Sequence, residues 1–326
     1  MTAAPRLALS ASATRRWLNC LAIASLGIAT ATLGAAADTP LRRPAGALPA
    51  ALAEKLLVER DLIYANPDGR QPQHLDLFVP KEGPGPFPLV VWIHGGSWQT
   101  GSKAGAGGVL RLTSFGYAAA SIDYRLTDVA KFHAQIEDSK AAIRWLRAHA
   151  AQYRIDPDRI GVWGASAGGH LVALLGTTGN TREFDVGANL DVSSRVQAVC
   201  DFYGPSDFLA IINGPNSHVL NTADGPVGKL LGGPPREMSD AARRASPVTY
   251  VAKDNAPFLI VHGTLDPTVP PAQSQILYDL LVQTGVEAQM HFIPGAKHGG
   301  PEFSSPEINA MIRAFFDRHL KPIPKN

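Results

Sequence analysis

The chain has 326 residues, of which 45% are hydrophobic and 18% charged, so it can bury a large core and is not globally disordered. A formal net charge of +2 is too small to indicate nucleic acid or an anionic membrane surface as a partner.

The first predicted element is an export signal over residues 1–37. Arg15 and Arg16 precede an apolar run, which ends in the small residues Ala35 to Ala37. This order matches a secretory signal peptide with cleavage after about Ala37. The alternative is a membrane anchor, since residues 17–37 are long enough to span a bilayer, but the small residues favour cleavage. We therefore expect an exported protein, periplasmic or extracellular, without stable membrane insertion, and the export route (Sec or twin-arginine) stays open.

Residues 38–55 are rich in Pro and Ala, which predicts a linker or a loosely held arm. Beyond them, apolar segments alternate with amphipathic ones. Residues 74–80 alternate apolar and polar positions, as a half-buried strand does. Five further segments are near-continuous apolar runs between turn residues, namely 87–95, 117–124, 159–164, 196–204 and 257–263. The sequence thus predicts an α/β domain over residues 56–326, with a mostly parallel sheet covered by helices on both faces.

Three helices are predicted from apolar residues at helical spacing, over 132–153, 271–285 and 306–320. One stretch, about 205–245, breaks the alternation and is rich in Gly, Pro and Asn. An irregular segment of that length inside a domain is usually functional, so we expect a short lid-like insertion or a binding loop.

Ser166 is the candidate nucleophile. It is the central residue of Gly164-Ala165-Ser166-Ala167-Gly168, a G-x-S-x-G motif that follows a predicted strand and precedes a predicted helix. This context is typical of a nucleophile elbow, which presents a serine at the carboxyl edge of a sheet.

A serine needs a base, and the base needs an orienting acid. His298 lies on a loop just after the apolar segment 289–293 and before the last helix, so it is the candidate base. His133 and His149 fall on a predicted helix, His291 within a strand and His319 near the C-terminus, and His170 is interpreted as packing beside the motif. Asp266 follows a buried strand in a turn and is the candidate acid, with Asp201 and Asp207 as rivals and Asp123 interpreted as structural.

The developing negative charge of such a reaction needs backbone donors. His94-Gly95-Gly96 follows a predicted strand, and its glycines let the backbone approach a substrate oxygen. The amide of Ala167, directly after the serine, is the second expected contribution.

The chain resembles α/β-hydrolase-fold serine esterases, of the branch related to bacterial feruloyl esterases and the hormone-sensitive-lipase group. The residues that carry the resemblance include "VVWIHGGSW", "GVWGASAGGHLVALLG", "PFLIVHGTLDPTVP" and "GAKHGG". The order Ser166, Asp266, His298 is that of the family's catalytic triad. The resemblance implies an eight-stranded sheet and an oxyanion hole formed by the amides of Gly96, Ser97 and Ala167.

The resemblance implies ester hydrolysis through an acyl-enzyme. Aromatic pocket candidates, the absence of a long apolar lid and the expected export favour short-chain, acetyl or aryl (feruloyl-type) esters, with a small-molecule or polysaccharide-linked substrate. Trp98, Tyr203 and Phe208 are candidate pocket residues. No cofactor is implied, and the sequence shows no metal-ligand spacing. The H-G-G-x-W form of residues 94–98 also occurs in kynurenine formamidases, so an amidase on the same triad stays open. A prolyl-oligopeptidase-type exopeptidase and a non-catalytic binding module are the remaining alternatives, and oligomeric state is not predicted.

Overall fold

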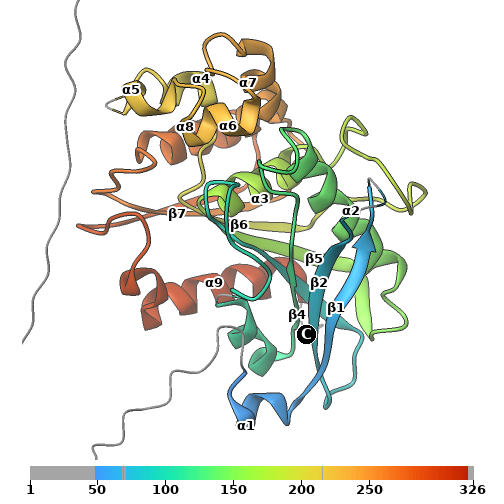
Figure 1. The fold of residues 1–326 in the computed structure, drawn as a ribbon. Coiled ribbons are helices and arrows are strands. Elements are labelled where there is room, and N and C mark those ends of the chain that lie inside the picture. Colours follow the sequence, from blue (N-terminus) through green and yellow to red (C-terminus); the bar gives the residue numbers. More distant parts are fainter. Residues whose placement is uncertain (1–47, 68, 70, 107, 215, 322–326) are drawn as a thin grey trace, which may run out of the picture. The chain divides into compact units, whose positions relative to one another are not determined.

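Eight strands in one sheet form the centre of the described part of the protein (Figure 1). The computed structural model describes residues 48–321 except 68, 70, 107 and 215, and all of them belong to one unit, residues 43–326. The predicted export signal, residues 1–37, lies outside the described residues.

The strand order is β1-β2-β4-β3-β5-β6-β7-β8. The strands are β1 (Leu56–Ala65), β2 (Gln73–Pro80), β3 (Phe87–Ile93), β4 (Ala118–Ile122), β5 (Ile155–Ala165), β6 (Ala198–Phe202), β7 (Phe258–Gly263) and β8 (Ala288–Ile293). Every neighbouring pair from β4 to β8 is parallel, whereas β2 is antiparallel to both of its neighbours. The carboxyl ends of β3, β5, β6, β7 and β8 therefore meet at one edge, and the predicted mostly parallel α/β sheet is confirmed.

Strand β1 was not predicted from its sequence. Polar residues interrupt its alternation, and its pairing with β2 shifts register between Glu59 and Leu62, where Asp61 takes a φ of 55°. An edge strand that pairs on one side only tolerates such a bulge.

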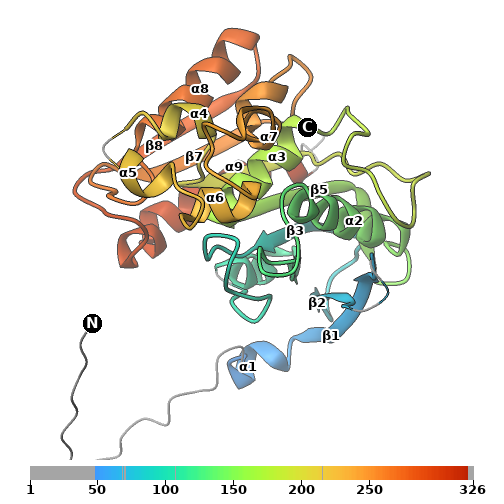
Figure 2. The ribbon, with the colours of Figure 1, turned by 45° about the horizontal axis from the view of Figure 1, so that its top comes forward.

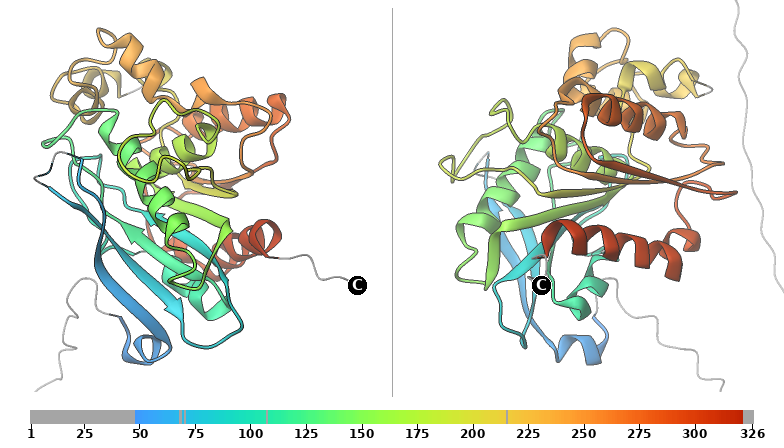
Figure 3. Two further views of the ribbon diagram at one scale, coloured as in Figure 1. Left: turned by 90° about the vertical axis from the view of Figure 1, so that its right-hand side faces the viewer. Right: turned by 180° about the vertical axis from the view of Figure 1, so that it is seen from behind.

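Helices cover both faces of the sheet (Figure 3). One face packs against α2 (Ala134–Ala148), α3 (Ala167–Thr177) and α8 (Ala272–Thr284), whose buried side chains include Ile143, Leu171 and Leu277. The opposite face packs against the 3₁₀ segment η1 (Val109–Phe115) and against α9 (Pro306–Leu320).

The helix predicted over 132–153 is shorter than expected. Its last residue is Ala148, because the chain turns through residues 149–154 into β5, with Arg154 at a φ of 57°.

The insertion at 205–245 is helical rather than irregular. It forms four short helices, α4 (Phe208–Ile211), α5 (Ser217–Leu220), α6 (Pro226–Leu231) and α7 (Ser239–Ala245), which group on the α3 and α8 side of the sheet (Figure 2). Pro226 is the first residue of α6, and Gly232 ends it in the left-handed region at a φ of 89°. The Pro and Gly residues that suggested a loop therefore mark helix boundaries. The 3₁₀ segments η2 (Pro247–Tyr250) and η3 (Pro301–Ser304) complete the elements that follow.

The segment just before the sheet is also more ordered than expected. Within the predicted arm 38–55, helix α1 (Ala50–Ala53) forms, and Leu48 and Leu52 pack against the core on the α9 side. Among the described residues, no helix combines the length and apolar character needed to cross a bilayer.

Candidate active site

Ser166 occupies a tight turn between β5 and α3. Its backbone has a φ of 57° and a ψ of −119°, a conformation that strains a non-glycine residue. Two glycines make room for the turn: a Cβ on Gly164 would lie 2.3 Å from the Gly168 oxygen, and one on Gly168 would lie 2.0 Å from the Ile93 oxygen. The Ser166 amide donates to the carbonyl of Phe202 at 2.8 Å. The glycines thus permit close packing, while Ser166 itself holds the strained dihedral angles.

The structure brings Ser166, His298 and Asp266 into one hydrogen-bonded chain. Nε2 of His298 lies 2.9 Å from the Ser166 Oγ, and Nδ1 of the same ring lies 2.6 Å from Oδ2 of Asp266. His298 lies on the loop after β8 and Asp266 on the loop after β7, so both reach the same edge of the sheet as Ser166. Because a carboxylate only accepts, Nδ1 of His298 donates, and Nε2 of the neutral ring is left to accept from the serine hydroxyl.

Asp266 is fully enclosed and fully hydrogen-bonded. Its Oδ1 accepts from the amides of Thr268 at 2.8 Å and Val269 at 3.0 Å. Its Oδ2 faces two histidines, His298 at 2.6 Å and His262 at 3.2 Å. Burial alone would raise the pKa of Asp266, but the hydrogen bonds from His262 and His298 and the backbone lower it below its ordinary value. The carboxylate therefore stays ionised at neutral pH.

The sequence patterns did not single out His262 as a functional residue. It is the penultimate residue of β7, a strand whose six residues are all buried, and its side chain is 0% exposed. A lone histidine in an otherwise apolar strand, four residues before the candidate acid, is the signal that points to it.

The loop after β3 turns sharply beside Ser166. Gly96, Ser97 and Trp98 have consecutive φ values of 113°, 55° and 59°, all in the left-handed half of the map. A Cβ on Gly95 would lie 2.7 Å from the Ala165 oxygen, so this loop passes against the Ser166 turn. Within the described part of the chain, no hydrogen bond uses the backbone amides of Gly96, Ser97 or Ala167. These three amides are therefore available to an external acceptor.

Neighbouring groups hold this loop on both sides. The His94 ring stacks on Tyr124 with centroids 4.3 Å apart, and the Tyr124 hydroxyl donates to the His94 carbonyl at 3.0 Å. The amide of Thr127 donates to the Trp98 carbonyl at 2.9 Å. The Trp98 indole in turn donates to Nδ1 of His170 at 3.1 Å.

A small cavity of about 40 Å³ opens beside Ser166. Its walls come from the loop after β3, the start of α3, the insertion and the loop after β7, through Ser97, Trp98, Ser166, Ala167, Pro205, Ile211, Leu220, Pro226, Val227, Thr268 and Val269. Three of the four short helices of the insertion, α4, α5 and α6, thus supply much of one apolar wall.

Two of the three predicted pocket residues lie elsewhere. Phe208 is fully buried behind Trp98 and His170, with ring centroids 5.7 Å and 5.0 Å away, so its assignment to the pocket was wrong. Tyr203 is not part of the cavity wall, and its ring packs 4.7 Å from that of His298. Both residues follow β6, but Phe208 begins α4 and turns inward. Trp98 does line the cavity.

The rival acids have other partners. Asp207 is the N-cap of α4 and accepts from the amides of Leu209 and Ala210. Asp201 is buried in β6, where its Oδ1 accepts from the Gly204 amide at 2.9 Å, and burial raises its pKa to about 6. His170 is fully buried, and its Nε2 lies 2.7 Å from the Ala245 carbonyl. In the described part of the chain, no group of three or more His, Cys, Asp or Glu side chains is arranged to hold a metal ion.

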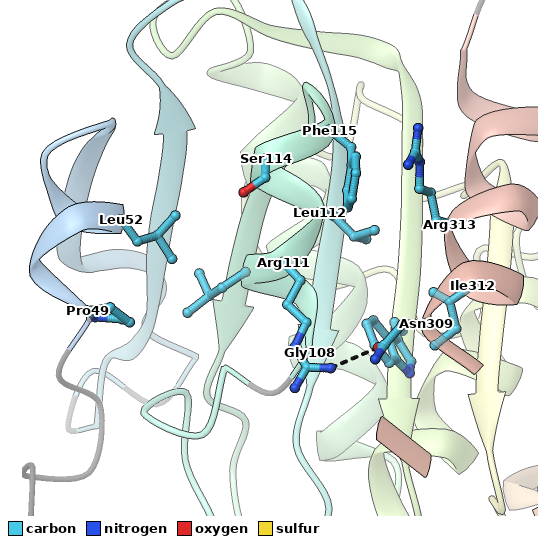
Figure 4. A pocket seen from close by; sticks show the side chains of 12 residues that line it. Pro49, Leu52, Gly108, Arg111, Leu112, Ser114, Phe115, Asn309, Ile312 and Arg313 are labelled. Carbon is cyan, nitrogen blue, oxygen red and sulfur yellow. Dashed lines mark hydrogen bonds between the residues drawn. The ribbon is translucent and has the colours of Figure 1, made fainter. Parts of the chain in front are cut away.

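A larger cavity of about 540 Å³ lies on the α9 face, away from Ser166 (Figure 4). Leu52, Leu112, Phe115 and Ile312 contribute apolar surface, and Arg111 donates to Asn309 across it. Among the described residues that line it, none is a histidine and none carries a carboxylate. It therefore lacks the groups needed for base-assisted hydrolysis, and the smaller cavity is the candidate site.

The sequence places this chain in a known family. The BD-FAE family model matches residues 75–281, more than half of the chain. This chain belongs to the BD-FAE family. The matched range includes Ser166 and Asp266 but ends before His298.

Named relatives of this BD-FAE protein are ester hydrolases. Esterase LipC of Mycobacterium tuberculosis is 31% identical over 233 residues, which cover 70% of this chain and 57% of LipC. This chain spans about half the length of the curated relatives it matches.

Solved structures agree on the fold. A truncated carbohydrate esterase from gut microbiota superposes with a TM-score of 0.73 at 33% identity, over 80% of this chain and 95% of that one. An acetyl ester-xyloside bifunctional hydrolase from Caldicellulosiruptor lactoaceticus gives a TM-score of 0.65 at 25% identity, over 78% and 90%. The predicted α/β-hydrolase fold is therefore confirmed.

Proposed function

We propose that this BD-FAE protein is a serine carboxylic ester hydrolase, with Ser166 as nucleophile, His298 as base and Asp266 as orienting acid. The observation that carries the proposal is the hydrogen-bonded chain from Asp266 through His298 to the strained Ser166, at the mouth of an apolar cavity. The esterase names of its relatives and structural neighbours support the same reaction class.

The reaction follows from the positions of these atoms. Ser166 Oγ attacks the ester carbonyl while Nε2 of His298 takes its proton. The amides of Gly96, Ser97 and Ala167 hydrogen-bond the oxyanion that forms. His298 then gives the proton to the leaving alcohol, which departs and leaves an acyl group on Ser166. A water molecule, deprotonated by His298, attacks the acyl-enzyme. His298 then returns this proton to the Ser166 Oγ as the acyl–oxygen bond breaks, which releases the carboxylic acid. Asp266 holds the ring in the Nδ1–H tautomer and stabilises the imidazolium.

The cavity indicates a short acyl group. A space of about 40 Å³ between Trp98, Leu220 and Val227 favours an acetyl group over a larger aromatic acyl group such as feruloyl. The alcohol then projects out of the cavity, so it can be large. Structural neighbours described as a carbohydrate esterase and an acetyl ester-xyloside hydrolase support an acetylated sugar as the substrate class. No observation favours the amidase alternative.

Export also remains a proposal. Arg15 and Arg16, the apolar run and the small residues Ala35 to Ala37 support a signal peptide cleaved after about Ala37. Determining the N-terminal sequence of the protein recovered outside the cytoplasm tests it, because an uncleaved N-terminus would contradict it.

The decisive experiment combines labelling and turnover. A fluorophosphonate probe should label the wild-type protein and not Ser166→Ala, and p-nitrophenyl acetate should be hydrolysed faster than the butyrate or octanoate esters. A parallel assay with an N-formyl aryl amine separates esterase from amidase. Absence of label on the wild-type protein, or label that persists in Ser166→Ala, would contradict the proposed nucleophile.

A further inference from the structure

A second histidine lies behind the proposed triad. Nε2 of His262 is 2.9 Å from the Val269 carbonyl and 3.2 Å from Oδ2 of Asp266. Both of these oxygens can only accept, so Nε2 of His262 must carry a hydrogen, which it donates to the Val269 carbonyl while Oδ2 of Asp266 lies beside it at ion-pair distance. Nδ1 of the neutral ring then accepts from the Ser274 hydroxyl, 2.6 Å away in the first turn of α8.

Burial and hydrogen bonds fix the orientation of the His262 ring. His262 and Ser274 are both 0% exposed, so no water competes for these contacts. The Val269 carbonyl sets the tautomer and the direction of the Nε2–H bond, and the Ser274 hydroxyl gives Nδ1 a partner. His262 thus connects the loop 266–269 to β7. Within the loop, the backbone amides of Thr268 and Val269 donate hydrogen bonds to Oδ1 of Asp266.

We propose that His262 is a positioning residue for catalysis: its Nε2–H holds Oδ2 of Asp266 and disperses part of the carboxylate charge that faces His298. This inference rests on the proposed triad and extends it to four side chains, Ser166, His298, Asp266 and His262. His262 does not line the cavity and reaches the site through Asp266 and through the Val269 carbonyl.

The proposal has a consequence for the pH dependence of activity. The titratable groups around Asp266 are His298 after β8, His262 on β7, and Tyr203 and Asp201 at the end of β6. With the His262 donor removed, more of the negative charge on Asp266 acts on His298 and favours its protonated form. The acid side of the kcat/KM profile should then move to higher pH, and a looser carboxylate should lower kcat.

Two substitutions separate the contacts of His262. The amide nitrogen of Gln reaches the position of Nε2, whereas the amide oxygen of Asn reaches the position of Nδ1. His262→Gln can therefore keep the donor to Asp266 and lose the bond with Ser274, and His262→Asn can do the reverse. Ser274→Ala is the matched control, because it removes the Ser274 bond and leaves His262 in place.

The test measures kcat, KM and the pH profile on p-nitrophenyl acetate, with the melting temperature of each variant. We expect His262→Asn to lower kcat about tenfold or more at unchanged KM and to move the acid limb to higher pH. We expect the acid side of the pH profile to stay at its wild-type position in His262→Gln and Ser274→Ala, even where their melting temperatures fall. The inference would be overturned if His262→Asn kept the wild-type kcat and the wild-type acid side of the pH profile. It would also be overturned if His262→Gln moved the acid side of the profile as far as His262→Asn does.

Ser166→Ala and Asp266→Asn are assayed beside these variants. If they retain turnover, the proposed function itself fails. If they lose turnover while His262→Asn behaves as wild type, only the role of His262 fails.

Discussion

The indole N–H of Trp98 donates to Nδ1 of His170 across 3.1 Å, which links the loop after β3 to the helix that follows Ser166. The same ring also contacts α7, because its Nε2 forms a hydrogen bond with the Ala245 carbonyl at the end of that helix. Burial lowers the pKa of His170 to about 4, so the ring is neutral at physiological pH and keeps one donor and one acceptor. The His170 ring thus joins the loop after β3, α3 and the end of α7, and the first two of these segments line the cavity.

Trp98→Phe tests this link. The substitution keeps an aromatic ring and leaves Nδ1 of His170 buried without a donor, which should lower the free energy of unfolding by about 1–3 kcal/mol. Urea unfolding at pH 7 measures the loss. Trp163→Phe is the control, since the Trp163 indole is as buried as that of Trp98 and its Nε1 has no hydrogen-bond partner within the described chain. Equal losses in the two variants would show that the Trp98 bond adds no stability.

Leu220→Ala should enlarge the cavity beside Ser166. The substitution removes an apolar wall residue of α5, so longer acyl groups should fit. The ratio of kcat/KM for butyrate over acetate esters should rise about tenfold or more. Leu230→Ala removes a fully buried leucine of α6 outside the cavity wall and should leave the ratio unchanged. Equal ratios in both variants and in the wild type would contradict the acyl cavity.

Gly168→Ala should destabilise the turn at Ser166. The new Cβ would lie 2.0 Å from the Ile93 oxygen and 2.7 Å from the His94 oxygen, and backbone atoms cannot move aside. We expect a loss of about 1–3 kcal/mol in the free energy of unfolding, together with a large loss of turnover. In Gly105→Ala the nearest atom is 3.7 Å away, so stability and activity should be retained. Thermal melts and fluorophosphonate titration of both variants provide the comparison.

The pH profile of the wild-type enzyme should have a single acid limb. The lowered pKa of Asp266 keeps its carboxylate ionised at all pH values where the enzyme works. The fall in kcat/KM toward acid pH should therefore follow protonation of the histidine base. Asp266→Asn should lower kcat about 10⁴-fold because it favours the wrong tautomer. A rate that stays constant from pH 8 to pH 5 would contradict His298 as the base.

Asp201 should make stability depend on pH in the opposite sense to a paired carboxylate. Burial raises its pKa to about 6 in the folded protein, whereas an unfolded aspartate titrates near 3.9. Between these values only the folded state holds the proton, so the stabilisation is full below about pH 4 and is lost as pH rises through about 6. Relative to Asp201→Asn, the wild type should lose on the order of 3 kcal/mol between pH 4 and pH 7. Urea unfolding across this range measures it, with the exposed Asp191→Asn as a control; a constant difference would contradict a buried titrating carboxyl.

Local sequence patterns predicted most strands of the sheet, and a local motif predicted that Ser166 lies in a turn between a strand and a helix. Continuous apolar runs mark β3 and β7 because both faces of those strands are covered, and the G-x-S-x-G motif has a local backbone cause. Strand β1 was missed because an edge strand need not alternate cleanly. Phe208 was misplaced, and His262 was not recognised, because the contacts of a side chain at or beyond the end of a strand depend on packing between distant segments.

Ser166 lies 132 residues from His298, and His298 lies 32 residues from Asp266. The reactive arrangement therefore forms only after β5 to β8 have paired and the loops at their carboxyl ends have been brought together. Contacts of such sequence separation are slow to form, because loop closure costs entropy before the contact stabilises the chain. During refolding, reactivity of Ser166 toward a fluorophosphonate should return after helical circular dichroism does, which makes it a marker for the last stage of folding.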